Sequence, residues 1–272
     1  MLKKIFAWAS ILLFSAFSLY PILYVISVSL RSDNAFQTQS LEIISASSNF
    51  KNFSSLFFET DFLLWLRNSL LISAVTTFAG VVLASTSAYA LSRYRFRGRN
   101  TMLFSLLVSQ MFPATMLMLP FYIILSKLHL IDSFLGLFVI YSSTALPFCI
   151  WQMKAYYDTI PRELEEAALL DGCSKWMIFT KIILPVSSPA LVITALFSFM
   201  NSWSEYVIAA VVLQDPALYT LPLGLRSFQA SLATQWGLYA AGALIVSVPA
   251  LILFISISRY LVSGLTMGSV KG

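Results

Sequence analysis

The 272-residue sequence has few charged side chains: 11% are Asp, Glu, Lys or Arg, whereas 58% are hydrophobic. A water-soluble globule of this composition would expose large apolar areas, so the sequence predicts a membrane protein. It has one histidine, His129, which lies beside Asp132 and is too isolated for a metal site or a proton relay. The two cysteines, Cys149 and Cys173, fall in a predicted span and a predicted loop, and they imply no disulfide framework.

The sequence also lacks a Gly-rich phosphate-binding loop followed by Lys and Ser or Thr, so it predicts no nucleotide site in this chain. We expect no bound cofactor and no metal, and any energy from ATP must enter through a partner. A membrane-embedded transferase, the alternative from another class, would need clustered carboxylates and histidines at a membrane face. The one acidic cluster has no histidine with it, and we therefore expect a protein that is not an enzyme. This cluster comprises Glu163, Glu165, Glu166 and Asp171.

Six apolar segments are long enough to cross a hydrocarbon core of about 30 Å. Backbone groups in lipid must be satisfied within the segment, so these are helices. The expected fold class is all-α, a polytopic membrane protein with six transmembrane helices in a single domain, 1–272. The predicted spans are Ala7–Ser29, Asn68–Leu91, Thr101–Ser126, Ser133–Trp151, Ser188–Leu213 and Gly237–Tyr260.

The first segment could also be a secretory signal peptide, because Lys3 and Lys4 precede its apolar run. The run continues to Ser29, which is longer than a signal core, and no clear Ala-x-Ala site follows. We interpret it as a retained anchor.

The basic residues give an orientation, because short cytoplasmic loops retain Lys and Arg. With the N-terminus inside, twelve of the seventeen basic residues are cytoplasmic, and the other five are Arg31, Lys51, Arg67, Lys127 and Arg226. The net charge of +5 is therefore explained by membrane topology, and no nucleic-acid partner is expected. Both termini are predicted to be cytoplasmic, in a cell membrane with lipid around the spans. The twelve are Lys3, Lys4, Arg93, Arg95, Arg97, Arg99, Lys154, Arg162, Lys175, Lys181, Arg259 and Lys271.

A polar segment in the predicted cytoplasmic loop 157–187 has a pattern that no membrane span requires. It reads Glu166-Ala167-Ala168-Leu169-Leu170-Asp171-Gly172, and after nine intervening residues comes Ile182-Ile183-Leu184-Pro185. Thr159 can cap a helix, Pro161 suits its first turn and Gly172 its end, which predicts a helix of about three turns. A helix lying on the bilayer surface is the alternative, but anionic lipid repels an acidic helix. We interpret the segment as a docking element.

This pattern resembles the EAA loop of the permease subunits of bacterial binding-protein-dependent ABC importers. Three further segments are similar to carbohydrate-type permeases, most of all to those of maltose and maltodextrin, although Ser204 stands where relatives often have Asn. They are Trp203-Ser204-Glu205, Thr220-Leu221-Pro222-Leu223-Gly224-Leu225 and Gly264–Gly272.

The resemblance implies the type I ABC importer permease fold and a set of partners. These are a second homologous permease, two ATP-binding cassette subunits that bind ATP and Mg, and an extracytoplasmic sugar-binding protein. Carried over by position, Glu166 would pair with basic groups in an ATPase groove, Ala167 and Ala168 would pack on its floor, and Gly172 would permit the turn out of it. Asp171 would cap the helix or form a local ion pair. The tail residues Gly268, Val270 and Lys271 would insert between the ATPases.

Substrate contacts are less sharply predicted. Asn201, Trp203, Glu205 and Tyr206 combine aromatic, amide and carboxylate groups, which suit the apolar faces and hydroxyls of a sugar. The same side chains could instead bond neighbouring helices, and in relatives the partner permease carries most sugar contacts. The binding protein is expected to meet two external regions, the stretch from Arg31 to Arg67 and the loop 214–236 between the fifth and sixth spans.

The cargo could also be trehalose, a galactooligosaccharide or glycerol 3-phosphate. A phosphate would favour arginine in the cavity, and no arginine lies deep within a predicted span. A scaffold that only anchors a complex would explain the docking helix but not the other spans. The resemblance implies ATP-driven import of a sugar, maltose/maltodextrin or a similar oligosaccharide, and trehalose, a galactooligosaccharide and glycerol 3-phosphate are the alternative cargoes.

Overall fold

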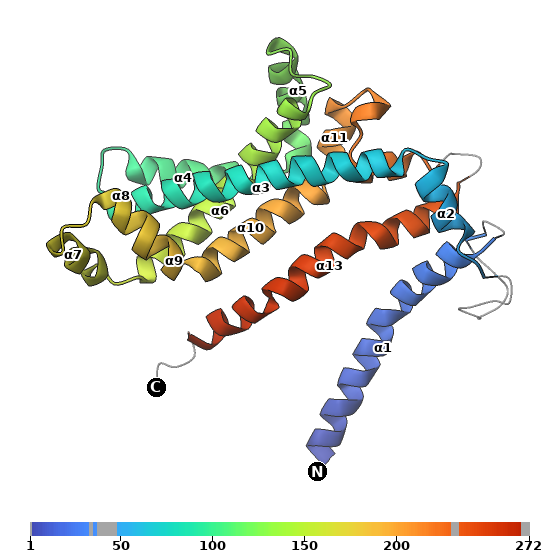
Figure 1. Ribbon diagram of the computed structural model, residues 1–272, viewed down its shortest axis with the longest axis horizontal. Coiled ribbons are helices and arrows are strands. Elements are labelled where there is room, and N and C mark those ends of the chain that lie inside the picture. Colours follow the sequence, from blue (N-terminus) through green and yellow to red (C-terminus); the bar gives the residue numbers. More distant parts are fainter. Residues whose placement is uncertain (1, 33–34, 37–47, 230–233, 268–272) are drawn as a thin grey trace. The chain divides into compact units, whose positions relative to one another are not determined.

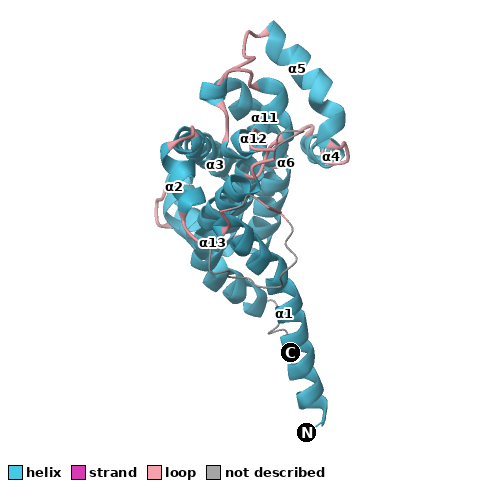
Figure 2. Ribbon diagram, turned by 90° about the vertical axis from the view of Figure 1, so that its right-hand side faces the viewer, coloured by secondary structure: helices cyan, strands magenta, loops and turns pink. Residues whose placement is uncertain are grey.

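The computed structural model of the chain describes residues 2–32, 35–36, 48–229 and 234–267. Every regular element in these residues is helical, and Figure 2 shows helices joined by loops. The described residues belong to two compact units, which we call unit 1 (Met1–Leu66 with Leu221–Pro249) and unit 2 (Arg67–Thr220 with Ala250–Gly272). The all-α prediction is confirmed.

Four long apolar helices in the described part of the chain can each cross a membrane. They cover the first, second, fourth and sixth predicted spans. Proline lies inside three of them, at Pro21, Pro147 and Pro249, without ending the helix. The four are α1 (Leu2–Leu30), α3 (Phe62–Arg93), α6 (Phe134–Thr159) and α13 (Trp236–Met267).

The third predicted span, Thr101–Ser126, is not one continuous helix, and the prediction of a single helix there is wrong. Pro113 has no backbone N–H to donate and has ψ 133°, outside the helical range. The residue before it, Phe112, is also restricted by the proline ring. The segment is therefore divided into α4 (Arg99–Ser109), the 3-10 turn η1 (Ala114–Leu117) and α5 (Met118–Lys127).

The fifth predicted span is bent at its start and broken near its end. Helical residues Lys175–Val186 and Ser188–Trp203 meet at 79°, and this pair could form one further span. The described helices thus supply four or five spans, and the predicted six are not all present as continuous helices. The elements are α8 (Lys175–Ile178), the π-helical turn η2 (Phe179–Ile183), α9 (Leu184–Val186), α10 (Ser188–Trp203) and α11 (Val207–Val212).

The hydrophobic core of unit 2 lies where α3, α6 and α10 pack together, and α6 and α10 lie side by side (Figure 1). Ala84 and Ala88 of α3 and Ala190 of α10 are fully buried, and their small side chains allow helices to approach closely. The same cluster continues to helix α7 (Glu163–Leu170), beside α8. α7 lies at one end of unit 2, whereas α5 and α11 lie at the other (Figure 1).

In unit 1, helix α2 (Lys51–Phe58) is joined to the end of α1 by a side-chain amide. Asn52 Nδ2 donates to Ser29 O at 2.9 Å and to Arg31 O at 2.7 Å. Ser29 lies in the last turn of α1 and Arg31 directly follows it, where the carbonyls of a helix have no partner within the helix. The amide therefore fixes the exit of the first span.

In the described residues of the predicted external loop 214–236, the structure has two short helices, η3 (Pro216–Leu218) and α12 (Leu221–Arg226), and no span. Gly224 of α12 lies against the ring of Trp65, and a Cβ at this glycine would lie 2.1 Å from Trp65 Cδ2. Only glycine permits this close approach.

Candidate functional site

Helix α7 covers the segment that the sequence predicts to be a docking element, and it ends as predicted before Gly172. Gly172 has φ 82°, in the left-handed region that glycine adopts without strain. Its N–H donates to Leu169 O at 3.1 Å, and the N–H of Cys173 donates to Ala168 O at 3.0 Å. These bonds satisfy carbonyls in the last turn and stop the helix.

The start of α7 differs from the prediction. Thr159 does not cap it, because Thr159 ends helix α6 and its Oγ1 donates to Tyr156 O at 2.7 Å. α7 begins after Arg162 without a side-chain cap, and Pro161 precedes it. Its eight residues make about two turns rather than three. Three glutamates in the first turn interact favourably with the positive end of the helix dipole.

Two side chains of α3 hold the inner face of α7. Arg93 Nε donates to Glu165 Oε1, and Tyr89 Oη donates to Glu165 Oε2 at 2.7 Å. Arg93 Nη2 also donates to Ile160 O at 3.0 Å. The Arg93 and Glu165 side chains are only 7% and 14% exposed, and Ala168 is buried in the adjoining core. These contacts fix α7 to the end of the second span.

The outer face of α7 carries the other predicted docking residues. Glu166, Ala167 and Asp171 are exposed, and Leu170 beside them is 91% exposed. Neither Glu166 nor Asp171 forms an ion pair with another described residue. The structure therefore brings these residues to one surface, but it places Ala168 inside the chain.

Sequence reasoning missed Glu165, Arg93 and Tyr89. Membrane topology explains all of the arginines between positions 93 and 99 alike, which leaves no reason to single out one of them. In the structure Arg93 pairs with Glu165, and Arg99 Nε donates to Leu91 O at 2.7 Å. These two basic side chains therefore also join elements of the protein.

Glu205 lies in the break between α10 and α11, where its carboxylate bonds to backbone. Oε1 accepts from Ile208 N at 2.8 Å, and Oε2 accepts from Ala209 N at 3.0 Å. Tyr141 Oη of α6 donates to Oε2 at 3.0 Å. The first N–H groups of a helix have no partner within it, so this carboxylate satisfies α11 and ties it to α6.

The other three predicted substrate residues lie in different surroundings. Trp203 is buried and stacks on Phe199, with 5.3 Å between ring centroids. Tyr206 is half-buried directly before α11. Asn201 lines a cavity of unit 2. Asn201 therefore lines the cavity, whereas Trp203, Glu205 and Tyr206 do not.

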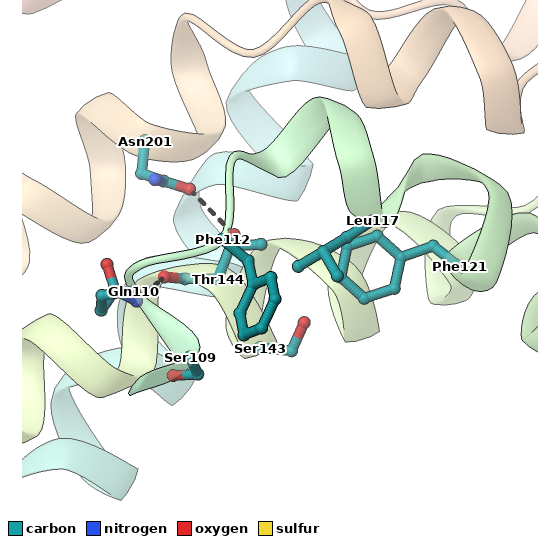
Figure 3. Close-up of a pocket in the computed structure, with 8 residues that line it drawn as sticks. All are labelled: Ser109, Gln110, Phe112, Leu117, Phe121, Ser143, Thr144 and Asn201. Atoms are coloured by element: carbon teal, nitrogen blue, oxygen red, sulfur yellow. Dashed lines mark hydrogen bonds between the residues drawn. The ribbon is translucent and has the colours of Figure 1, made fainter. Parts of the chain in front are cut away.

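This cavity has a volume of about 440 Å³ and lies between the break after α4, helix α5, the middle of α6 and the last turn of α10 (Figure 3). Gln110 Nε2 donates to Thr144 O at 3.2 Å, and Thr144 Oγ1 donates to Asn201 Oδ1 at 3.4 Å. No residue of the lining is charged. The lining residues are Ser109, Gln110, Phe112, Leu117, Phe121, Ser143, Thr144 and Asn201.

The predicted tail residues Gly268, Val270 and Lys271 lie outside the described residues, so their role stays a prediction. Within the described part of the chain, no group of three His, Cys, Asp or Glu side chains is placed to hold a metal ion.

Comparison with known proteins identifies the family. The profile of the binding-protein-dependent transport system inner membrane component matches residues 77–266, which include α7 and the cavity. The chain belongs to this family. It is accordingly a multi-pass membrane permease.

Curated relatives match over all or most of the chain. The maltodextrin transport system permease protein MdxG of Bacillus subtilis is 36% identical and covers 100% of this chain and 98% of its own length. The maltose/maltodextrin permease MalG of Salmonella typhimurium is 34% identical, covering 100% and 97%. The diacetylchitobiose uptake permease DasC of Streptomyces coelicolor is 34% identical, covering 82% and 81%.

A solved structure supports the fold. A chain of a bacterial ABC transporter involved in the import of the acidic polysaccharide alginate aligns with TM-score 0.82 at 24% identity. The alignment covers 94% of this chain and 96% of that chain. This chain therefore shares its fold with that transporter chain.

Proposed function

We propose that this chain is the permease subunit of an ATP-driven importer for neutral oligosaccharides of the maltodextrin type. It acts with a second homologous permease, two ATPase subunits that bind and hydrolyse ATP with Mg, and an extracytoplasmic sugar-binding protein. The observation that carries the proposal is the geometry of α7 in a chain of this family. α7 is fixed to the spans on one face and presents acidic and apolar side chains on the other.

The exposed face of α7 has the chemistry of a protein contact. Leu170 is 91% exposed, and Trp176 of the following helix is 69% exposed. Large exposed apolar side chains rimmed by polar ones are typical of interaction sites. Glu166 adds an exposed carboxylate, which suits a basic group of an ATPase. In this proposal Glu166, Ala167, Asp171 and Gly172 face the ATPase, whereas Ala168 supports the helix from within.

The motion passes from the ATPases to the spans through the inner face of α7. When ATP closes the ATPase pair, a displacement of α7 is transmitted to α3 by the Arg93–Glu165 ion pair and to the core by Ala168. Rigid contacts of this kind convert movement at a surface into a rocking of the helices. ATP chemistry therefore stays in the partners, and this chain supplies the mechanical connection.

In this proposal α7 and both termini lie in the cytoplasm, because most Lys and Arg residues are on the same side of the spans as α7 and short cytoplasmic loops retain such residues. The tail from Gly268 to Lys271 then lies on the ATPase side. The ends of α5 and α11 lie at the opposite end of unit 2 from α7 (Figure 1), and they face the binding protein.

The test replaces Gly172 with glutamine and uses Gly98→Gln as a matched control. Both glycines have positive φ, 82° and 91°, and a Cβ at either meets nothing within 4 Å. Both variants therefore incur a similar backbone strain of about 1–2 kcal/mol. We expect Gly172→Gln to lose ATPase copurification and sugar uptake in proteoliposomes, while Gly98→Gln retains both.

Equal behaviour of the two variants would contradict the proposal. Loss in both would show that backbone strain, not docking, is responsible. Retention in both would show that the end of α7 does not contact the ATPase.

A further inference from the structure

The cavity between α4, α5, α6 and α10 lies close to the middle of the bilayer. Gln110 follows the first residue of α4, Arg99, by eleven residues, which is about 16 Å of helix. Thr144 follows the first residue of α6, Phe134, by ten residues, or about 15 Å, from the opposite end of unit 2. The hydrocarbon core is about 30 Å thick. The two estimates therefore place the polar lining at mid-depth.

Polar groups and irregular backbone at this depth require water or protein around them. The chain between Ser109 and Ala114 is not helical, and Gln110 and Ser143 are exposed. Non-helical backbone at membrane depth occurs only where it is buried in protein or lines an aqueous cavity. The break at Pro113 and the amide of Gln110 thus indicate a water-filled part of the translocation path.

The lining offers both donors and acceptors to a polyhydroxylated molecule. Asn201 Oδ1 accepts from Thr144, but among the described residues no partner accepts from Asn201 Nδ2. Gln110 Nε2 donates to Thr144 O, and within the same residues no donor bonds to Gln110 Oε1. Asn201 therefore keeps an amide donor and Gln110 an amide acceptor. A sugar hydroxyl both donates and accepts, so it can bond to either group.

Aromatic rings complete the lining (Figure 3). Phe112 is 54% exposed, so part of its ring is open to a bound molecule. The C–H faces of a sugar ring are apolar and pack against such rings, while its hydroxyls bond to nearby amides. A volume of about 440 Å³ lies within the range of small-molecule sites.

We propose that this cavity is a subsite at which this chain itself binds one neutral sugar ring of the cargo during translocation. The inference rests on the proposed import of oligosaccharides and names the residues that contact them. Gln110, Thr144 and Asn201 bind hydroxyls, and Phe112 packs on the ring. The uncharged lining selects against phosphorylated and acidic sugars, because neither would find a cationic partner there.

The experiment uses the complete transporter in proteoliposomes with its binding protein and maltotriose as the probe. Asn201→Leu removes the free amide donor, and we expect uptake at low maltotriose to fall about three- to tenfold. Gln152→Leu is the matched control. Gln152 also joins α6 to α10, accepting from Thr194 Oγ1 at 2.6 Å, but it does not line the cavity. Its uptake should change less than that of Asn201→Leu at equal amounts of folded transporter.

A second measurement does not depend on these variants. Ser143→Cys is introduced into a functional chain carrying Cys149→Ala and Cys173→Ala, and is treated with a charged thiol reagent. We expect labelling in the complete transporter and at least threefold slower labelling with maltotriose, loaded binding protein and ATP. Ser202→Cys is the control that stays unlabelled, because Ser202 is 3% exposed.

Two results would overturn the subsite while leaving the proposed function intact. In one, wild-type transporter imports maltotriose, but Asn201→Leu imports it equally well and Ser143→Cys is not protected. In the other, Ser143→Cys reacts in the isolated chain and never in the complete transporter, which means that the second permease fills the cavity. If wild-type transporter imports no sugar at all, the proposed function fails and the subsite with it.

Discussion

The carboxylate of Glu165 joins helix α7 to helix α3, and we expect Glu165→Gln to loosen α7 while the spans stay folded. In the wild type the carboxylate accepts from Arg93 Nε and, at 2.7 Å, from Tyr89 Oη. Glutamine has nearly the same shape but no charge, and only one of its two terminal atoms accepts a hydrogen bond. Either Arg93 or Tyr89 therefore loses its acceptor.

The size of the effect follows from burial. The two side chains of the ion pair are 7% and 14% exposed, so water compensates little. Removal of one partner of a buried ion pair destabilises by about 3–5 kcal/mol. Arg93 keeps its bond to Ile160 O, and glutamine keeps one acceptor, so we expect about 2–3 kcal/mol. This corresponds to roughly 30- to 150-fold in the opening equilibrium of α7.

Hydrogen exchange of the α7 amides in the purified permease measures this opening. The matched control is Glu166→Gln, because Glu166 is the next residue, is exposed and has no ion pair among the described residues. We expect Glu165→Gln to accelerate exchange in α7 and Glu166→Gln to leave it unchanged. In the complete transporter, Glu166→Gln should instead weaken ATPase binding.

Equal exchange in the two variants would refute the assignment of Glu165 to the inner face. The double variant Glu165→Gln with Arg93→Gln gives a second check. If the two residues interact directly, its effect should be smaller than the sum of the single effects by about 1–3 kcal/mol.

Two further predictions concern other regions of the chain. Gly224→Ala should lower stability by about 1–3 kcal/mol, because its Cβ would overlap the ring of Trp65, and a lower thermal unfolding temperature would show it. The backbone N–H groups of Asp215 and Gln214 hold the pKa of Asp132 below its usual value. Asp132 therefore contributes stability that is present above the ordinary pKa of about 3.9 and is lost as the pH falls through the lowered pKa. Thermal unfolding temperatures should fall more from about pH 5 to about pH 3 in the wild type than in Asp132→Asn, and equal slopes would contradict this.

The sequence predicts the ends of elements better than it predicts their partners. Gly172 ends α7 because its backbone conformation is a local property, and that prediction is confirmed. Glu165 and Glu166 are chemically the same and adjacent, so only the position of Arg93, far away in the chain, decides which of them faces inward. No spacing within the segment contains that information.

The positions of proline and acidic residues within spans also depend on tertiary partners that the sequence does not predict. Pro21, Pro147 and Pro249 lie inside helices, whereas Pro113 lies at a break. Composition alone does not separate these cases, because neighbouring helices and cavities decide where free backbone groups can be satisfied. The sequence suggests Glu205 as a sugar contact, and it gives no sign that the carboxylate accepts from the N–H groups of α11, as the structure shows.

The candidate cavity was predictable only in part. Asn201 was selected for its amide, but Gln110 and Thr144 come from different helices and form no motif in the sequence. Their meeting depends on the packing of α4 and α10 against α6, which is a tertiary property.

The central claim is that the outer face of α7 contacts the ATPase. The most direct measurement places a photo-cross-linking amino acid at position 166 or 170 of the complete transporter, and at position 128 as a control. Leu170 and Leu128 are both exposed, at 91% and 58%. Leu170 is the last residue of α7 and Leu128 directly follows α5, and these two helices lie toward opposite ends of unit 2 (Figure 1). We predict adducts with the ATPase from positions 166 and 170 and none from position 128. ATPase adducts from position 128 alone, or from none of the three positions, would contradict the account.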